Sequence, residues 1–230
     1  MNLLKILYPE RCIICDGVLA LSEHNFCGKC LSELKLIKEP VCMRCGRPVK
    51  SEEEYCEECR EVKHNFVGGR FSFSYEQTAS GLYRFKYMNR MRYAVGYGEI
   101  LGRELKTWIG AVGADALVPV PLHKKRLIKR GYNQAKLLAE EISRHTGIPV
   151  YADLVARIKN TVPQKTFDRK HRVNNLKNAF IVRENVVKLD TVIIVDDIFT
   201  TGSTIDSLSE ALTAAGVKRV FFITVTAAGT

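Results

Sequence analysis

Two adjacent carboxylates followed by a hydroxyl-rich turn form the stretch of this 230-residue sequence with the most evident chemistry. Two apolar residues separate Asp196 and Asp197 from a run of small residues: Thr200, Thr201, Gly202, Ser203 and Thr204. A turn that opens a helix presents free backbone N–H groups and the positive end of the helix dipole, so it can hold a phosphate. Neighbouring acids can accept hydrogen bonds from the hydroxyls of a sugar. The stretch therefore predicts a phosphoribosyl site.

The hydropathy on either side predicts the strand and the helix that would hold this turn. Residues 192–195 are apolar at consecutive positions, which suits a strand covered on both faces in a parallel sheet. Beyond the turn, apolar residues recur at helical spacing until Gly216, a helix stop signal. The motif of a Walker P-loop and the spaced glycines of a dinucleotide fingerprint are both missing. The alternative is an ordinary strand–turn–helix with two surface acids.

All eight cysteines lie in regularly spaced Cys-x-x-Cys pairs, which are Cys12/Cys15, Cys27/Cys30, Cys42/Cys45 and Cys56/Cys59. Each pair can supply half of a tetrahedral zinc site. The simplest arrangement joins the first two pairs around one structural zinc ion and the last two around another. An interleaved arrangement and disulfides are the alternatives. His24 and His64 are expected at the surface rather than as ligands. Because few apolar residues lie between the pairs, zinc is expected to supply most of the stability of this region.

Composition and charge limit the class of protein. A hydrophobic content of 46% supports a packed core, and no apolar run approaches the ~18 residues of a membrane span. The apolar run near the N-terminus is too short for a signal peptide, so we expect a protein of the reducing cytoplasm. The formal net charge of +10 favours anionic partners, either phosphate compounds or nucleic acid.

The chain is expected to fold as a small zinc-ribbon domain, residues 1–64, and a larger domain, residues 65–230. In the larger domain, strands are expected over residues 71–75, 116–122, 179–182, 192–195 and 220–225, and helices over residues 77–87, 94–109, 133–145 and 205–215. Four basic side chains around the first of these helices are expected on a solvated face: Arg84, Lys86, Arg90 and Arg92.

Two basic segments complete the set of candidate site residues. The loop before the helix at 133–145 offers a second anion site, and its candidate ligands are Lys124, Arg126 and Arg130. A DNA-facing or merely soluble loop is the alternative. Residues 156–178 are basic, have little apolar periodicity and predict a long mobile flap. Such a flap can exclude water from a substrate, or clasp a phosphate backbone with Phe167 stacked on a base. A plain surface loop is again the alternative.

The acidic pair and its turn resemble the phosphoribosyl pyrophosphate (PRPP) motif of type I phosphoribosyltransferases. With the cysteine pairs, the residues Pro-Val-Pro-Leu-His at 119–123 and Arg-Gly-Tyr-Asn-Gln at 130–134 resemble the ComF family. The resemblance implies an α/β fold: a type I phosphoribosyltransferase-like parallel sheet with flanking helices, preceded by a double zinc ribbon. It also implies that Asp196 and Asp197 hold the ribose, residues 200–204 the 5′-phosphate and the basic loop the pyrophosphate. Mg²⁺ would be bound together with PRPP.

The same resemblance implies a cytoplasmic protein that takes part in the uptake of single-stranded DNA during natural transformation. A DNA helicase or translocase of the competence machinery would be among its partners. Two functions stay open at this point. In the first, the chain serves DNA uptake and binds PRPP with Mg²⁺; in the alternative, it is an active phosphoribosyltransferase with an unidentified acceptor, unrelated to DNA uptake. The sequence defines neither an acceptor pocket nor a catalytic base.

Overall fold

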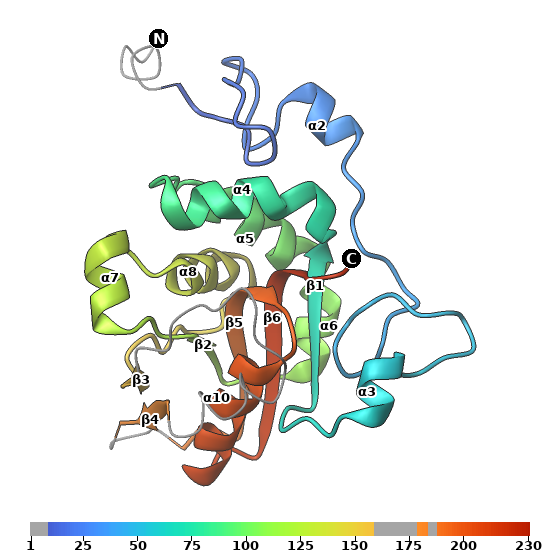
Figure 1. Cartoon of the computed structure of the whole chain (residues 1–230), viewed down its shortest axis with the longest axis vertical. Helices are drawn as coiled ribbons and strands as arrows, with labels where there is room; N and C mark the ends of the chain where they lie inside the picture. Colours follow the sequence, from blue (N-terminus) through green and yellow to red (C-terminus); the bar gives the residue numbers. More distant parts are fainter. Residues whose placement is uncertain (1–8, 159–178, 184–187) are drawn as a thin grey trace.

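A four-stranded parallel sheet forms the centre of the protein (Figure 1). The computed structural model describes residues 9–158, 179–183 and 188–230. The strand order is β1-β6-β5-β2, with the bounds β1 (Gly68–Phe73), β2 (Ala116–Pro119), β5 (Thr191–Phe199) and β6 (Arg219–Ala227). A separate antiparallel pair consists of β3 (Val155–Arg157) and β4 (Phe180–Val182). The predicted parallel sheet with flanking helices is confirmed.

Strand β5 occupies an interior position of the sheet, between β6 and β2. The side chains of residues 192–195 are completely buried, as expected for a strand covered on both faces. The strand also runs further than predicted. It continues through the two aspartates to Phe199, because β6 pairs with it as far as Ala227. The two aspartates therefore lie within the strand, near its carboxyl end, rather than in the loop that follows it.

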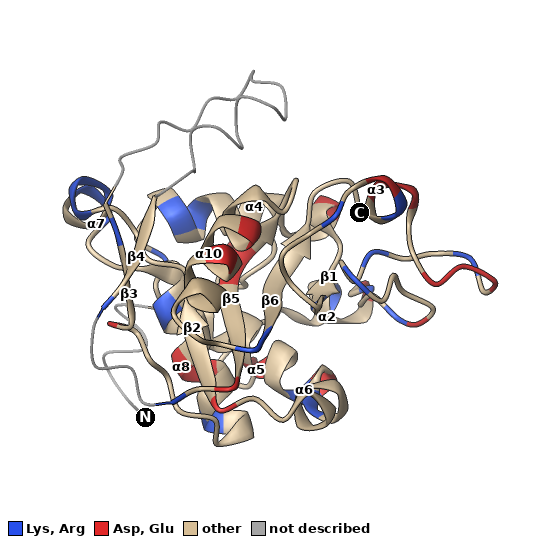
Figure 2. Ribbon diagram, turned by 90° about the horizontal axis from the view of Figure 1, so that it is seen from below, with Lys and Arg blue, Asp and Glu red and all other residues tan. Residues whose placement is uncertain are grey.

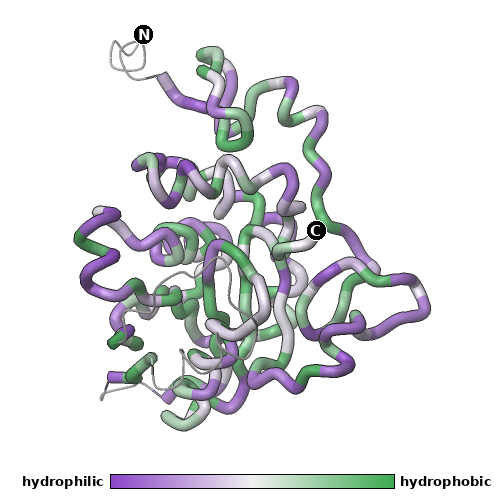
Figure 3. Tube along the Cα trace, viewed as in Figure 1, coloured by the Kyte–Doolittle hydropathy of each residue, from purple (hydrophilic) through white to green (hydrophobic). Residues whose placement is uncertain are grey.

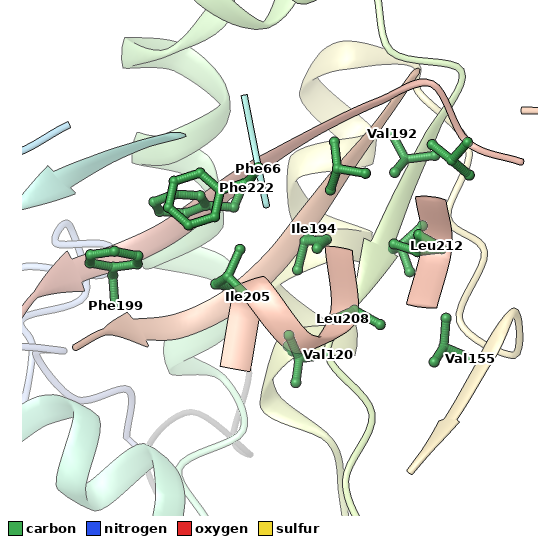
Figure 4. Packing of buried hydrophobic residues seen from close by; sticks show 14 of the residues in the cluster. Phe66, Val120, Val155, Val192, Ile194, Phe199, Ile205, Leu208, Leu212 and Phe222 are labelled. Carbon is green, nitrogen blue, oxygen red and sulfur yellow. The ribbon is translucent and has the colours of Figure 1, made fainter. Parts of the chain in front are cut away.

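Helices cover both faces of the sheet. One face packs against α4 (Tyr75–Tyr87), α5 (Tyr93–Glu104), α6 (Lys106–Val112) and α8 (Gln134–Thr146). The other face packs against α10 (Ser203–Ala214), and the packing of Ile205, Leu208 and Leu212 onto this face is drawn in Figure 4. The helix predicted over residues 94–109 is instead two helices, which meet at Leu105.

The basic segment after β2 is a helix, not the predicted loop. It forms α7 (Lys124–Arg130), a short helix coloured by its lysines and arginines in Figure 2. His123 caps its start by accepting a hydrogen bond from the backbone N–H of Lys125. Gly131, with φ of +84°, ends it in the left-handed conformation that glycine adopts without strain. The cap and the stop explain how seven residues can stay helical here.

The two zinc ribbons pack against different parts of the sheet domain (Figure 1). The first contains α2 (Gly28–Ser32) and lies on α4 and α5, where Ile13 and Phe26 join the core. The second contains α3 (Glu57–Glu61) and lies beside β1, where Cys42 and Cys45 join the core on the α10 side. The outer loop of the second ribbon is largely hydrophilic (Figure 3). Packing against the sheet domain thus adds to the stability of the ribbons, most of which was expected to come from zinc.

Among the residues that the structure describes, every helix is too short or too polar to cross a lipid bilayer.

Candidate functional site

The two aspartates lie at the carboxyl end of β5, the edge at which ligands of open α/β sheets bind. Asp197 is buried, and its Oδ1 lies 2.8 Å from Nζ of Lys86 on α4. Asp196 is partly buried, and its Oδ1 accepts a hydrogen bond of 2.8 Å from the backbone N–H of Asp197. Successive residues of a strand point to opposite faces. The two carboxylates therefore flank the strand end from either side.

The pKa of Asp196 is unusually high for a carboxyl group. Burial, followed by the nearby charge of Asp197, raises the pKa of Asp196 to about 7. Lys86 and Arg157 act in the opposite direction, but they do not cancel the effect. A carboxyl group that titrates near neutral pH is costly for the fold and is common at sites of ligand binding or catalysis.

The predicted phosphate loop joins the end of β5 to the start of α10. Gly202 precedes the helix with φ of +76°, a left-handed conformation that favours glycine. A Cβ atom at this position would also lie 3.0 Å from Cε1 of His64. The hydroxyl of Thr201 lies 3.1 Å from the hydroxyl of Ser203 within the same turn. A helix start with small, hydroxyl-bearing residues is an arrangement that can hold an anion.

Arginine side chains from α7 and β3 lie close enough to one another and to Asp196 for their charges to interact. Burial, and then the charge of Arg130, lower the pKa of Arg126 on α7. Burial, and then Arg126, lower the pKa of Arg157 on β3, whereas Asp196 raises it. The structure thus brings Arg126 and Arg130, two of the three predicted anion ligands, into one cluster with Arg157. Lys124 begins α7 and is exposed to solvent.

The sequence did not indicate that Lys86 belongs to the site, and it placed Arg157 only in the predicted basic flap. The expectation that the basic residues around α4 form a solvated face holds for Arg92, whose side chain is 75% exposed, but it is wrong for the other three. Lys86 pairs with Asp197, and Arg90 donates two hydrogen bonds of 3.1 Å to the carboxylate of Asp16 in the first ribbon. Arg84 donates to the backbone oxygen of Ile14. Their partners are remote in the sequence, so no local pattern could have identified them.

Both groups of four cysteines have the geometry of a zinc site. The sulfur atoms of Cys12, Cys15, Cys27 and Cys30 lie within 4.8 Å of one another, as do those of Cys42, Cys45, Cys56 and Cys59. The Sγ–Sγ distances of 3.8 Å for Cys15 and Cys27 and 3.6 Å for Cys45 and Cys56 match a tetrahedron with Zn–S bonds of ~2.3 Å. All eight cysteines are free thiols. The simple pairing is confirmed, and the donor sets fit structural Zn²⁺.

His64 departs from the sequence-based expectation of a surface residue. Its side chain is 1% exposed, and its Nδ1 lies 2.8 Å from Oδ2 of Asp206 in the first turn of α10. Its ring stacks on Phe66 at 4.5 Å between centroids. His24, by contrast, is exposed as expected. Neither histidine belongs to the two cysteine groups.

The predicted flap falls almost entirely outside the described residues. Arg157 is the last of its basic side chains that the structure describes, on β3. Phe167 and the remaining basic residues lie in the range 159–178, which is not described.

The chain is similar to known families and proteins over most of its length. A family model for a double zinc ribbon domain matches residues 3–60, and one for a phosphoribosyl transferase domain matches residues 130–230. Competence protein F of Haemophilus influenzae is 33% identical over 216 residues, which cover 91% of this chain and 93% of the relative. DNA utilization protein YhgH of Salmonella typhimurium is 29% identical and covers 92% of this chain and 94% of its own length.

Two further similarities are more distant. Competence protein ComFC of Bacillus subtilis is 27% identical over 230 residues, with 89% of each chain covered. A crystal structure of an adenine phosphoribosyltransferase covers 75% of this chain and 91% of its own, with 15% identity and a TM-score of 0.39, too low to carry an argument. The assignment rests on the relatives and the family models. The chain belongs to the ComF family, in which a double zinc ribbon precedes a phosphoribosyltransferase domain.

Proposed function

We propose that the chain binds PRPP with Mg²⁺ at the carboxyl end of β5 and takes part in the uptake of single-stranded DNA during natural competence. The main support for PRPP is the succession of two carboxylates and a turn that can hold an anion at one strand end. The names of the relatives, competence protein F and DNA utilization protein, support the role in DNA uptake. A helicase or translocase is the expected partner, and the reducing cytoplasm the expected compartment.

Each part of the site has a proposed role. Asp196 and Asp197 accept hydrogen bonds from the ribose hydroxyls, and Asp197 also fixes Lys86. The turn binds the 5′-phosphate through Thr200, Thr201, Gly202, Ser203 and Thr204. Lys124, Arg126 and Arg130 face the pyrophosphate, and the gathered charge of Arg126 and Arg157 supports this role. Mg²⁺ bound with PRPP would offset the charge of the pyrophosphate oxygens.

The affinity for PRPP with Mg²⁺ is expected to rise with pH across neutrality. Asp196 has a pKa of about 7 without ligand, and its charged form accepts hydrogen bonds from a ribose diol more strongly than the neutral form does. The carboxyl is mostly protonated at pH 6 and mostly ionised at pH 8, so the affinity should increase several-fold. Calorimetric titration at pH 6, 7 and 8 measures this change. Asp196→Asn should flatten the profile, whereas an unchanged profile in that variant would assign the pH effect to the ligand.

The alternative function is an active phosphoribosyltransferase whose acceptor is unidentified. The raised pKa of Asp196 favours it, because a group that titrates near pH 7 can exchange a proton during catalysis. Transfer would release pyrophosphate from PRPP, so pyrophosphate release in the presence of candidate acceptors separates transfer from binding alone.

An aromatic and basic surface on α4 supports the proposed contact with single-stranded DNA. Tyr83 and Tyr87 are 59% and 60% exposed, and their ring centroids are 5.0 Å apart. The guanidinium of Arg130 lies 5.2 Å from the centroid of the Tyr87 ring. Exposed rings stack on bases, and the neighbouring arginine can contact a phosphate. The surface adjoins the proposed PRPP site, because Lys86 belongs to the same turn of α4.

Replacing Tyr83 and Tyr87 together by alanine is expected to weaken binding of an oligothymidylate about tenfold or more, since base stacking contributes ~1–3 kcal/mol per base. The steep dependence of the affinity on salt should remain, because the phosphate contacts are kept. Fluorescence anisotropy at several salt concentrations measures both quantities. Tyr75→Ala, at the other end of α4, is the matched control. Equal binding by the double variant and the control would remove this surface from the DNA contact.

A further inference from the structure

The second zinc ribbon contacts the predicted phosphate loop through the side chain of Arg47. Arg47 follows the knuckle of Cys42 and Cys45, and its side chain is 18% exposed. One of its nitrogens donates a hydrogen bond of 2.8 Å to the backbone oxygen of Thr200, and a weaker one of 3.3 Å to that of Ala228. Its guanidinium also lies 5.3 Å from the centroid of the Phe199 ring. A residue of the ribbon thus anchors the end of β5 and the start of the loop.

The position of Arg47 depends on the cysteine site. The backbone N–H of Cys42 donates to the oxygen of Arg47 at 2.7 Å, and that of Gly46 donates to the oxygen of Cys42 at 2.9 Å. The other terminal nitrogen of the Arg47 guanidinium pairs with Glu58, which lies between Cys56 and Cys59. Arg47 therefore links both knuckles of one zinc site to the loop. Zinc, by joining the knuckles, would fix the geometry of this link.

A second contact reaches the same loop from the segment after the ribbon. His64 pairs with one oxygen of Asp206, and the backbone N–H of Asn65 donates to the other at 2.8 Å. The backbone N–H of Asp206 donates in turn to the oxygen of Gly202 at 2.7 Å. The ring of His64 packs against Gly202. The start of α10 thus makes hydrogen bonds to His64 and Asn65, in the segment that follows the second ribbon.

These contacts have an electrostatic consequence for the loop. A backbone oxygen that pointed into an anion cradle would repel a phosphate. The hydrogen bond from Arg47 keeps the oxygen of Thr200 on the ribbon side of the loop. Holding a binding loop in one conformation also lowers the entropy that is lost when a ligand binds.

We propose that the second zinc ribbon is a positioning element for the phosphate loop. With zinc bound by Cys42, Cys45, Cys56 and Cys59, Arg47 and His64 keep residues 200–204 in the conformation that receives a 5′-phosphate. Occupancy of this zinc site therefore sets the affinity of the chain for the ribose 5-phosphate moiety. The inference deepens the proposed function and rests on it, but it assigns a role to residues that lie outside the predicted phosphate loop.

The test compares two ligands that use different parts of the site. Arg47→Ala is expected to weaken the binding of ribose 5-phosphate about tenfold, because the loop loses its anchor, and to leave the binding of pyrophosphate to the arginine cluster within about twofold. Zinc content should stay at two ions per chain. Arg44→Ala is the matched control, since Arg44 belongs to the same knuckle but lies over the Tyr55 ring. Cys56→Ser, with one zinc per chain, should reproduce the selective loss.

Hydrogen exchange of the amides of residues 200–206 gives a readout that needs no ligand. Exchange should be faster in Arg47→Ala than in the Arg44→Ala control. Equal weakening of both ligands, or unchanged exchange in the loop, would overturn the proposal. If the wild-type chain binds neither ligand, the proposed function fails, while the exchange rates still decide whether the ribbon holds the loop.

Discussion

Replacing Asp196 and Asp197 together by asparagine is expected to abolish the rise in melting temperature that PRPP with Mg²⁺ gives the wild-type chain. A ligand at 100 times its dissociation constant stabilises the native state by ~2.7 kcal/mol, or about 5–10 °C for a chain of this size. Asparagine keeps the shape of the side chain but loses its charge and one acceptor oxygen. Thermal unfolding with and without ligand measures the effect.

The single variants should differ in their effect on the protein without ligand. Because the native pKa of Asp196 lies above the ordinary value of 3.8, the native state holds the proton more tightly than the unfolded chain. Stability is therefore lost as pH rises from about 4 through about 7. Asp196→Asn removes this loss and should raise the melting temperature at pH 8. Asp197→Asn removes the charge that faces the largely buried Lys86, and should lower it.

The two substitutions change the stability of the ligand-free protein in opposite directions, so these changes partly cancel in the double variant. Both substitutions weaken ligand binding, so the double variant separates the loss of binding from a change in stability. Asp190→Asn is the control, since Asp190 precedes the other end of β5 and pairs with Lys218 on the surface. It should keep the full shift with PRPP. A double variant that retained the shift would place the sugar phosphate elsewhere on the molecule.

The sequence predicted the parts of the site that depend on local patterns. The buried run at 192–195, the small turn at Gly202 and the stop at Gly216 each identify an element over a few residues. The cysteine pairs also predicted both zinc sites and their pairing, because the spacing of zinc knuckles is a property of a short segment. These features need no knowledge of the tertiary structure.

The parts that the sequence did not predict depend on contacts between distant segments. His64 is 142 residues from Asp206, and Arg47 is 153 residues from Thr200. Lys86 reads as a surface residue until α4 is placed against the sheet. The helix α7 was missed for a different reason, because its seven residues are too few to show helical periodicity among so many charges.

Substitution of a zinc ligand should destabilise the sheet domain more in the second ribbon than in the first. Cys42→Ser is expected to reduce the zinc content from two ions to one and to lower the melting temperature by more than about 10 °C, because the zinc of a small ribbon carries several kcal/mol of folding free energy. Cys42 is completely buried and belongs to the same core cluster as Phe66 and Phe71. Loss of this zinc would expose that core.

Cys12→Ser is the matched variant in the first ribbon, since Cys12 is also the first cysteine of its group and is equally buried. It should also lose one zinc ion, but with a smaller fall in melting temperature. The first ribbon keeps contacts that do not need the metal, such as the hydrogen bond of 3.1 Å from the Tyr97 hydroxyl to the oxygen of Ile13. Zinc analysis by mass spectrometry and thermal unfolding by circular dichroism give both quantities for each variant.

The comparison tests whether the ribbons are parts of the fold or separate modules. If both variants lost zinc without changing the unfolding of the sheet, the ribbons would fold independently, and the burial of Cys42 and Cys45 against the sheet would contribute little. If only Cys42→Ser loosened the sheet, the second ribbon would complete the core on the α10 side. Since α10 begins at the predicted phosphate loop, a core that needs zinc would make the proposed ligand binding depend on the metal as well.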